Sequence, residues 1–326
     1  NWHPLEDRFL ISNNQNLIEV TIDGDFIEYP MTTYQRIYDP VYHPSGVSVA
    51  ATLGLADYDI AELSWGNSQS DLKKLDAFTD KRLFRSTVSE GGAKYRPNTL
   101  QSNSRDIVFS SNRSGSYQLW FDDGTQLKQL SHFTKGQRIG SSVWSLDGNL
   151  LAVNIDNHLQ LLSINGKVEQ VEKSLNIVGI YQWVDQNQLL MRIIKDKQSY
   201  IVLFDIISGE SKPLHQGVAN WAQVDSQQNL YLSDVKGRLF QVDDKKVLTR
   251  QLTQHTLHKK FLIKSDTMFF SNGSGEFWKY ELHSKDAKLI AKRSSRAVKL
   301  DDVDIENKRL LYLNYAQGRK EIVLIH

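Results

Sequence analysis

A β-rich segment recurs along this chain of 326 residues at intervals close to forty residues, and that period constrains the fold more than any other feature. Each copy joins a short polar turn to an apolar strand, most clearly at residues 144–153. Five copies of the turn start at residues 144, 183, 224, 263 and 303, with spacings of 39, 41, 39 and 40. Three more start at residues 3, 43 and 101, and the interval of 58 between the last two indicates an insertion.

Each unit continues with an alternating strand, a tight turn and a further strand. Asp or Asn followed by Gly supplies the positive φ angles that two-residue hairpin turns require. Such turns occur at Asp23-Gly24, Asp123-Gly124 and Asn165-Gly166, and Ser208-Gly209 is a related turn. No window of twelve residues has convincing helical periodicity. The sequence therefore predicts repeated antiparallel strands and no long helix.

Four strands in about forty residues is the length of one β-propeller blade. We predict an all-β protein, a single propeller domain of four-stranded antiparallel blades. Eight turn copies favour eight blades, and seven is the alternative because the incomplete first and last units could merge. The predicted units are residues 1–35, 36–93, 94–136, 137–175, 176–217, 218–256, 257–295 and 296–326.

One unit is distinctive enough to suggest a family. Residues 107–120 read as an apolar strand, then Ser-Asn-Arg with Asn112 and Arg113, then a second strand. A turn resembling Pro-Asp-Gly is present at residues 144–148, which include Asp147 and Gly148, and again at residues 42–46. These segments resemble the TolB-type propeller repeat. In that family these motif residues hold blades together and have no catalytic role.

The resemblance implies an extracytoplasmic propeller, expected here in the periplasm of a Gram-negative bacterium. Members of this family include free partners in envelope complexes, sensor domains of ToxR/CadC-type winged-helix transcriptional regulators, and propellers that precede a hydrolase domain. The chain has neither a winged helix nor room for a hydrolase domain. We therefore expect the periplasmic sensory domain of a membrane-anchored transcriptional regulator, with a free TolB-like scaffold as the alternative.

Composition excludes several other classes of protein. The chain has 39 Lys and Arg against 38 Asp and Glu, and it has no cysteine. The first observation excludes a strongly basic nucleic-acid binder, and the second excludes disulfide, thiolate and iron–sulfur chemistry. No apolar run approaches 18 residues, and the start at Asn1 lacks an initiator Met and a leader pattern. We interpret the chain as a processed or trimmed piece, with any membrane anchor outside it.

No motif in the sequence supports catalysis. Residues 140–144 lack the last glycine of a nucleophile elbow, and His255 and His258 have no third metal ligand nearby. The acidic run at residues 301–306 is interpreted as a solvated strand edge. Asp39 and Asp302 point towards a propeller lactonase with a channel metal, which is the second alternative, but no matching set of metal ligands can be assembled from the sequence. We predict no enzymatic activity, no cofactor and no metal.

Two sets of residues recur at corresponding places in the units. Large rings at the turns are predicted to fill the wedge between adjacent blades, and with the turn residues they form the structural set Trp2, Tyr42, Asn112, Arg113, Trp144, Asp147, Gly148 and Trp183. Cations also stand beside the first strands of several units. The candidate binding set at one channel mouth is Arg36, Tyr38, Tyr95, Arg96, Arg138, Lys259, Lys260 and Arg296.

A ring of cations at one mouth would attract an acidic peptide, a protein or a small anion. Residues 245–299 carry 13 Lys and Arg against 4 Asp and Glu, so two or three neighbouring blades are basic. The basic residues are not interleaved with an exposed aromatic platform, and we therefore expect no direct contact with nucleic acid. The sequence leaves the oligomeric state open.

Overall fold

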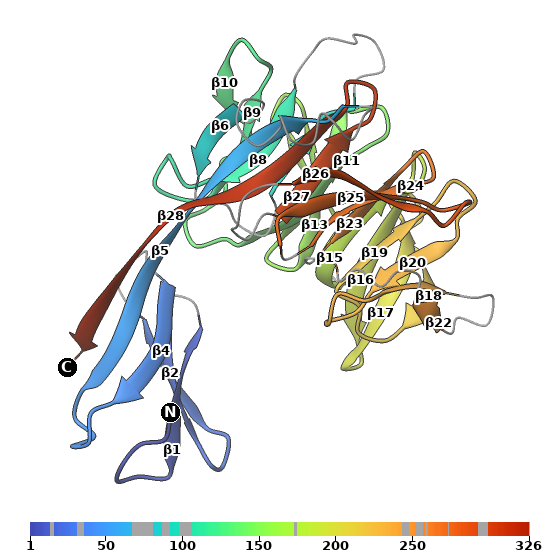
Figure 1. Ribbon diagram of the computed structural model, residues 1–326. Helices are drawn as coiled ribbons and strands as arrows, with labels where there is room; N and C mark the ends of the chain where they lie inside the picture. The colour runs from blue at the N-terminus through green and yellow to red at the C-terminus, as the bar shows by residue number, and fades with distance from the viewer. Residues whose placement is uncertain are drawn as a thin grey trace. The chain divides into compact units, whose positions relative to one another are not determined.

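The computed structural model describes residues 1–13, 16–30, 36–66, 81–86, 92–97, 106–172, 175–242, 248–251, 257, 260–272, 274–292 and 299–325. Within these ranges every regular element is a β-strand (Figure 1). The strand pairs whose register is described are antiparallel, as in β12 and β13. The prediction of an all-β chain built from antiparallel sheets is confirmed. In the described part of the chain, no helix is long and apolar enough to cross a membrane.

The chain divides into two compact units. Unit 1 comprises Asn1–Tyr58 and Tyr315–His326, and unit 2 comprises Asp59–Asn314. Two long strands, β5 (Val49–Ser64) and β28 (Arg309–Ile325), contribute residues to both units. The prediction of one domain with the boundaries given above stays a prediction.

Unit 1 contains a three-stranded sheet in the order β1-β2-β3, together with β4 and parts of β5 and β28. The bounds of its shorter strands are β1 Arg8–Asn13, β2 Asn16–Thr21, β3 Phe26–Pro30 and β4 Arg36–Tyr42. Its core contains Leu10, Leu17, Ile37, Tyr42 and Ala51, with Val323 and Ile325 packed against them. This core is separate from those of unit 2.

Unit 2 contains five four-stranded sheets in the described residues, each in simple up-and-down order. The first has β7 Ala93–Tyr95, β8 Ile107–Ser111, β9 Gln118–Asp122 and β10 Leu127–Gln129. The second has β11 Ile139–Trp144, β12 Leu150–Ile155, β13 His158–Ser163 and β14 Val168–Glu172. The third has β15 Asn176–Trp183, β16 Gln188–Lys195, β17 Gln198–Asp205 and β18 Ser211–Gln216.

The fourth sheet has β19 Trp221–Val224, β20 Leu230–Ser233, β21 Leu239–Val242 and β22 Leu248–Gln251. The fifth has β23 Phe261–Lys264, β24 Thr267–Ser271, β25 Glu276–Glu281 and β26 Ala287–Lys292. β27 (Lys299–Asp304) then pairs with β28, which is followed in that sheet by β5, and β6 (Lys81–Ser86) also pairs with β5. The predicted blade count and a closed ring stay predictions.

The sequence period corresponds to these sheets. The first strands from β11 onward begin at residues 139, 176, 221, 261 and 299, at intervals of 37 to 45 residues. The predicted hairpin turns are confirmed by the pairings of β2 with β3, β9 with β10, β13 with β14 and β17 with β18. Gly24, Gly124, Gly166 and Gly209 have φ angles of 92, 84, 81 and 74°, values that glycine reaches without steric cost.

Consecutive sheets of unit 2 pack face to face. One buried cluster joins Leu119 of the first sheet to Leu151 and Leu162 of the second. The next joins Leu161 of the second sheet to Leu189 and other residues of the third. These sheets therefore bury apolar side chains between them, which is the main source of stability in such a stack.

Polar side chains also connect neighbouring first strands. The hydroxyl of Ser141 on β11 accepts a hydrogen bond from the backbone N–H of Ile180 on β15, at 2.6 Å. The amide of Gln182 on β15 accepts from the N–H of Val224 on β19 at 2.8 Å and donates to its carbonyl at 3.1 Å. These bonds satisfy backbone groups that lie between sheets, beyond the ladder of either one.

Candidate functional site

The carboxylate of Asp301 on β27 is fully buried, with 0 % relative exposure, against β7. Its Oδ2 accepts a hydrogen bond from the backbone N–H of Ala93 at 3.1 Å. The next carboxylate, Asp302, accepts from the backbone N–H of Tyr95 at 2.9 Å. The side chain at position 92 must be small, because a Cβ on Gly92 would lie 2.6 Å from both carboxylate oxygens of Asp301. Two carboxylates thus bind the backbone of β7.

Three lysines surround Asp301. The Nζ of Lys260 lies 2.6 Å from Oδ1 of Asp301, and the Nζ of Lys299 lies 3.6 Å from the same oxygen. The Nζ of Lys94 donates to the backbone carbonyl of Asp301 at 2.6 Å. Lys260 is 3 % exposed, and its ammonium also lies 5.5 Å from the centre of the Trp221 ring. We name Lys94, Lys260, Lys299, Asp301 and Asp302 the β27–β7 cluster.

Burial and charge oppose each other in this cluster. Burial alone would raise the pKa of Asp301, but the ammonium groups of Lys260, Lys299 and Lys94 lower it to about 2. Burial lowers the pKa of Lys260 well below its usual value, against the opposing effect of Asp301. Burial likewise lowers the pKa of Lys94. The cluster therefore favours the ionised form of Asp301 and disfavours the protonated, charged forms of Lys260 and Lys94.

A pH titration is expected to reveal these lysines. Since the pKa of Lys260 is lower in the folded state, the unfolded chain binds more protons from that lowered pKa up to about 10.5. The free energy of unfolding should therefore rise with pH in this window, by at most about 1.4 kcal/mol per pH unit for one proton. Urea unfolding from pH 7 to 9.5 measures the slope, and Lys260→Met should flatten it. Equal slopes in the two proteins would contradict the assignment.

A second polar group lies beside the β27–β7 cluster. The hydroxyl of Tyr95 donates to Glu62 at 2.8 Å, and the guanidinium of Arg309 lies 3.6 Å from the same carboxylate. Arg309 also pairs with Asp304 at 2.5 Å. Burial, followed by the charge of Glu62, raises the pKa of Tyr95, so the phenol stays protonated at neutral pH. These side chains bond to one another, in an arrangement typical of a structural contact between sheets.

The expectation that residues 301–306 form a solvated strand edge was wrong for its first part. Asp301 and Asp302 are both buried, and Asp304 is partly buried and paired with Arg309. The physical reason is a register shift in the pairing of β27 with β28 between Leu300 and Asp302. The extra residue breaks the alternation of the strand, so both carboxylates turn towards β7.

The predicted cations do not gather at one mouth in the described residues. Arg96 follows β7, and its Nε donates to the carbonyl of Gly148, after the end of β11, at 2.6 Å. Arg138 precedes β11 at the opposite end of the first strands and is exposed. Lys260 is buried against Asp301, so its charge is engaged inside the protein. The structure therefore brings neither Arg96 nor Lys260 into a ring of accessible cations.

Other members of that predicted set lie elsewhere. Tyr38 lies on β4 in unit 1, where it is partly buried. The side chain of Arg36 and the whole of Lys259 and Arg296 lie outside the described residues, as do His255 and His258. Asp39 is exposed in unit 1 with a φ of 49°. Among the described residues, no group of three or more His, Asp or Glu is placed to hold a metal ion.

The structural set divides between buried and exposed positions. Trp144 is buried, with its ring 6.4 Å from that of Phe121 in the preceding sheet. Trp183 is buried, and its Nε1 donates to the carbonyl of Val143 across the sheets at 3.1 Å. Trp2, by contrast, is 62 % exposed. The wedge-filling position is therefore seen for the two tryptophans of unit 2 and not for Trp2.

The turn residues of this set have local roles. Asp147 accepts from the hydroxyl of Ser145 at 2.6 Å and from the N–H of Asn149 at 3.0 Å. Gly148 has a φ of 69°, and a Cβ there would lie 2.4 Å from the carbonyl of Pro97.

The Ser-Asn-Arg segment after β8 has local contacts as well. The carbonyl of Asn112 accepts from the N–H of Gly115 at 2.9 Å. Arg113 bonds to Ser111 at 3.1 Å and lies 5.0 Å from the ring centres of Phe109 and Trp120. This segment therefore closes the turn between β8 and β9.

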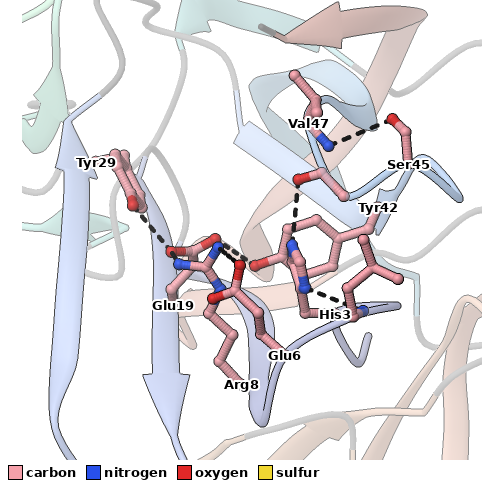
Figure 2. A network of polar contacts seen from close by, with 10 residues as sticks. His3, Glu6, Arg8, Glu19, Tyr29, Tyr42, Ser45 and Val47 are labelled. Carbon is pink, nitrogen blue, oxygen red and sulfur yellow. Dashed lines mark hydrogen bonds and ion pairs between the residues drawn. The ribbon is translucent and has the colours of Figure 1, made fainter.

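Unit 1 contains its own buried polar network, shown in Figure 2. Glu19 on β2 accepts hydrogen bonds from Tyr29 at 2.9 Å and from Tyr42, and it pairs with Arg8 at 3.0 Å. The ring of His3 packs edge-on against Tyr42 at 4.6 Å. Burial and the bond to Glu19 raise the pKa of Tyr42. Tyr42, which was predicted to be a structural residue, thus connects β4 to the β1-β2-β3 sheet of unit 1.

A cavity of about 230 Å³ lies at the ends of three successive first strands of unit 2, β15, β19 and β23. A fourth sheet contributes Leu146 from the turn after β11. The other lining residues are Gln182, Trp183, Val184, Val224, Asp225, Ser226, Gln228, Ile263, Ser265 and Asp266. We name this the mouth cavity. Four consecutive sheets offer side chains to this space.

Sequence reasoning missed the mouth cavity. Its signal was present, because an aspartate follows the first strand in the turns at Asp147, Asp185, Asp225 and Asp266. That recurrence was treated only as turn chemistry. The residues that line the cavity come from four sheets, and the spacing within one unit does not show that they meet.

Comparison with known proteins supports the fold. A putative TolB from Agrobacterium tumefaciens is similar, with a TM-score of 0.57, 11% identity, and coverage of 81% of this chain and 99% of that one. The nidogen/laminin complex contains a similar chain, with a TM-score of 0.51, 8% identity, and coverage of 72% and 97%. An oligogalacturonate lyase in complex with manganese has a TM-score of 0.49, with 12% identity and coverage of 86% and 81%.

At these identities the likeness concerns the fold alone. No protein-family model matches the chain, and no curated protein matches it. The TolB-type propeller resemblance suggested by residues 107–120 is therefore supported at the level of fold, whereas the transcriptional-regulator context has no support of its own.

Proposed function

We propose that unit 2 is a closed, non-catalytic binding propeller that holds part of a partner protein in the mouth cavity. The observation that carries this proposal is the convergence of four consecutive sheets on one cavity of about 230 Å³. Concave sites that combine apolar walls with a few polar groups are typical of ligand binding. The β27–β7 cluster, in contrast, bonds mainly to itself.

Closure of unit 2 is part of this proposal. β27 contacts β7, and β11, β15, β19 and β23 contact one another in order. The bonds of Asp301 and Asp302 to β7 support a ring in which the sheet of β27 follows that of β23 and precedes that of β7. Such a ring has six sheets, in place of the eight blades predicted from the turn copies. The mouth cavity would then lie at one end of the central channel.

We also propose an extracytoplasmic location, on the likeness to a TolB propeller. Two contexts suit this location: the sensory domain of a membrane-anchored transcriptional regulator, and a free scaffold in the envelope. Fractionation of cells that produce the full gene product distinguishes them. Recovery with the membrane after washing in high salt supports the first context, and recovery in the soluble periplasmic fraction supports the second.

Site-specific photocrosslinking tests whether the mouth cavity receives a partner. Leu146 is 51 % exposed at the cavity, and Ile207 is 75 % exposed in the turn after β17, outside the cavity lining. With p-benzoylphenylalanine at position 146, we expect a discrete crosslinked protein in the native cells. The same group at position 207 serves as the control and should not give that product. Absence of a product specific to position 146, in a variant with native circular dichroism, would overturn the proposal.

A further inference from the structure

The lining of the mouth cavity has one sign of charge. Its apolar members are Leu146, Trp183, Val184, Val224 and Ile263. Its charged members among the described residues are Asp225 and Asp266, and no described lysine or arginine lines it. A ligand that fills this cavity therefore meets apolar side chains on one part of its surface and two carboxylates on another.

Neutral donors hold both carboxylates in place. Asp225 accepts from the backbone N–H groups of Gln227 at 3.0 Å and Asn229 at 2.8 Å, and from the hydroxyl of Tyr231 at 3.1 Å. Asp266 accepts from the backbone N–H of Ser226 at 3.0 Å and from its hydroxyl at 2.7 Å. Hydrogen bonds from uncharged groups orient a carboxylate but add no positive charge beside it.

Two described residues near this cavity, Lys264 and His283, can carry positive charge. Lys264 directly follows the lining residue Ile263, but its Nζ lies 3.6 Å from Asp302 in the β27–β7 cluster. His283 lies 3.8 Å from Asp266 and is itself largely exposed. Asp266 is 26 % exposed, so an incoming group can reach it. The cavity thus combines two carboxylates with apolar lining residues.

We infer that the mouth cavity binds a basic segment of the partner protein, in which an arginine or lysine stands next to a large apolar residue. This inference rests on the proposed function and names the chemistry of the partner. The apolar side chain packs against Trp183 and Ile263, and the cation pairs with Asp225 and Asp266. A volume of about 230 Å³ equals that of roughly seven or eight water molecules, which suits one long side chain and part of its neighbour.

Two short peptides test the charge requirement. The first is acetyl-Ala-Leu-Arg-Ala-amide, and the second replaces arginine by citrulline, which has nearly the same shape and no charge. Titration of each into the full chain, followed by NMR or calorimetry, gives the two affinities. We expect the arginine peptide to bind at least five-fold more tightly at low salt, with the difference shrinking as salt is added. Equal affinities would overturn the inference.

Matched variants locate the binding. Asp225→Asn and Asp266→Asn keep the shape of the side chain and can still accept hydrogen bonds in the turns, and each should weaken the arginine peptide several-fold. Asp185→Asn removes the same charge from an equivalent turn outside the cavity lining and should leave the affinity unchanged. If all three variants bind the peptide equally well, the inference fails.

The crosslinking experiment separates the two failures. If p-benzoylphenylalanine at position 146 still gives its crosslinked product while the arginine peptide binds no more tightly than the citrulline peptide, the cavity receives a partner. The inference that this partner offers a basic segment is then wrong. If the product from position 146 is absent, the proposed function itself fails.

Discussion

Replacing Asp301 by asparagine is expected to lower the free energy of unfolding by about 3–5 kcal/mol, the usual cost of removing one partner from a buried ion pair. The variant leaves the ammonium group of Lys260 buried without the carboxylate that faces it, whereas the bond from Lys94 to the backbone carbonyl of residue 301 remains. In the parent protein the backbone N–H of Ala93 faces a carboxylate oxygen of Asp301. In the variant the amide of asparagine can place an N–H opposite it, which leaves this donor without an acceptor. Urea unfolding at pH 7 measures the change.

A double variant distinguishes lost charge balance from general damage. Lys260→Met in the Asp301→Asn background removes the ammonium that lies 2.6 Å from the carboxylate. Since buried ion pairs can be replaced by apolar groups at little cost, the double variant should be more stable than Asp301→Asn alone. If Asp301→Asn unfolds within about 0.5 kcal/mol of the parent protein, the β27–β7 cluster contributes little, and closure through it loses its support.

Carboxylates and lysines are an unusual means of connecting first strands in this chain. Between β11 and β15 the connection is the hydroxyl of Ser141, and between β15 and β19 it is the amide of Gln182. Both residues are neutral and come from strands of adjacent sheets. The connection of β27 to β7 joins parts of the chain 208 residues apart, as in the bond from Ala93 to Asp301.

Features within one repeat could be predicted from sequence. The hairpins at Asp23-Gly24 and Asn165-Gly166 depend on residues that are adjacent in the chain and on backbone angles that few residues adopt. The period of about forty residues likewise identifies the four-stranded sheets, because each of the five is built from consecutive segments.

Features that depend on distant segments could not be predicted in this way. Asp301 and Asp302 were expected at a solvated strand edge, and the register shift that turns both towards β7 depends on the pairing of β27 with β28. Lys260 was counted as an accessible cation because its burial depends on β27, far along the chain. The pairing of β28 with β5 joins segments from opposite ends of the chain, and it has no signal within a single repeat.

The mouth cavity illustrates the same limit for function. Asp225 and Asp266 could be recognised in sequence as turn residues, and both do bond to turn backbone. Their position beside Trp183 and Ile263 arises only when three sheets stand next to one another. The same carboxylate can therefore accept hydrogen bonds from the backbone of a turn and place its negative charge at the cavity.

Replacing Trp183 by alanine is expected to cost about 3–5 kcal/mol of stability, the typical effect of deleting a large buried ring. The ring is buried with Ile180, Leu189 and Met191 between sheets, and its Nε1–H bonds to the carbonyl of Val143. Trp183→Phe keeps most of the packing but loses this bond, so it should cost about 1–2 kcal/mol. Chemical denaturation of the two variants separates packing from hydrogen bonding.

Trp2→Ala is the matched control, because Trp2 stands at the equivalent place in the sequence repeat. Its ring is 62 % exposed and has an edge contact with Phe9 at 5.4 Å. An exposed ring contributes little to stability, and we expect a change within about 0.5 kcal/mol. Equal losses for Trp2→Ala and Trp183→Ala would mean that the recurring aromatic has one role throughout the chain, and the distinction between the two positions would be wrong. Unequal losses in the expected order would show that the repeat position alone does not determine how strongly its aromatic residue holds the sheets.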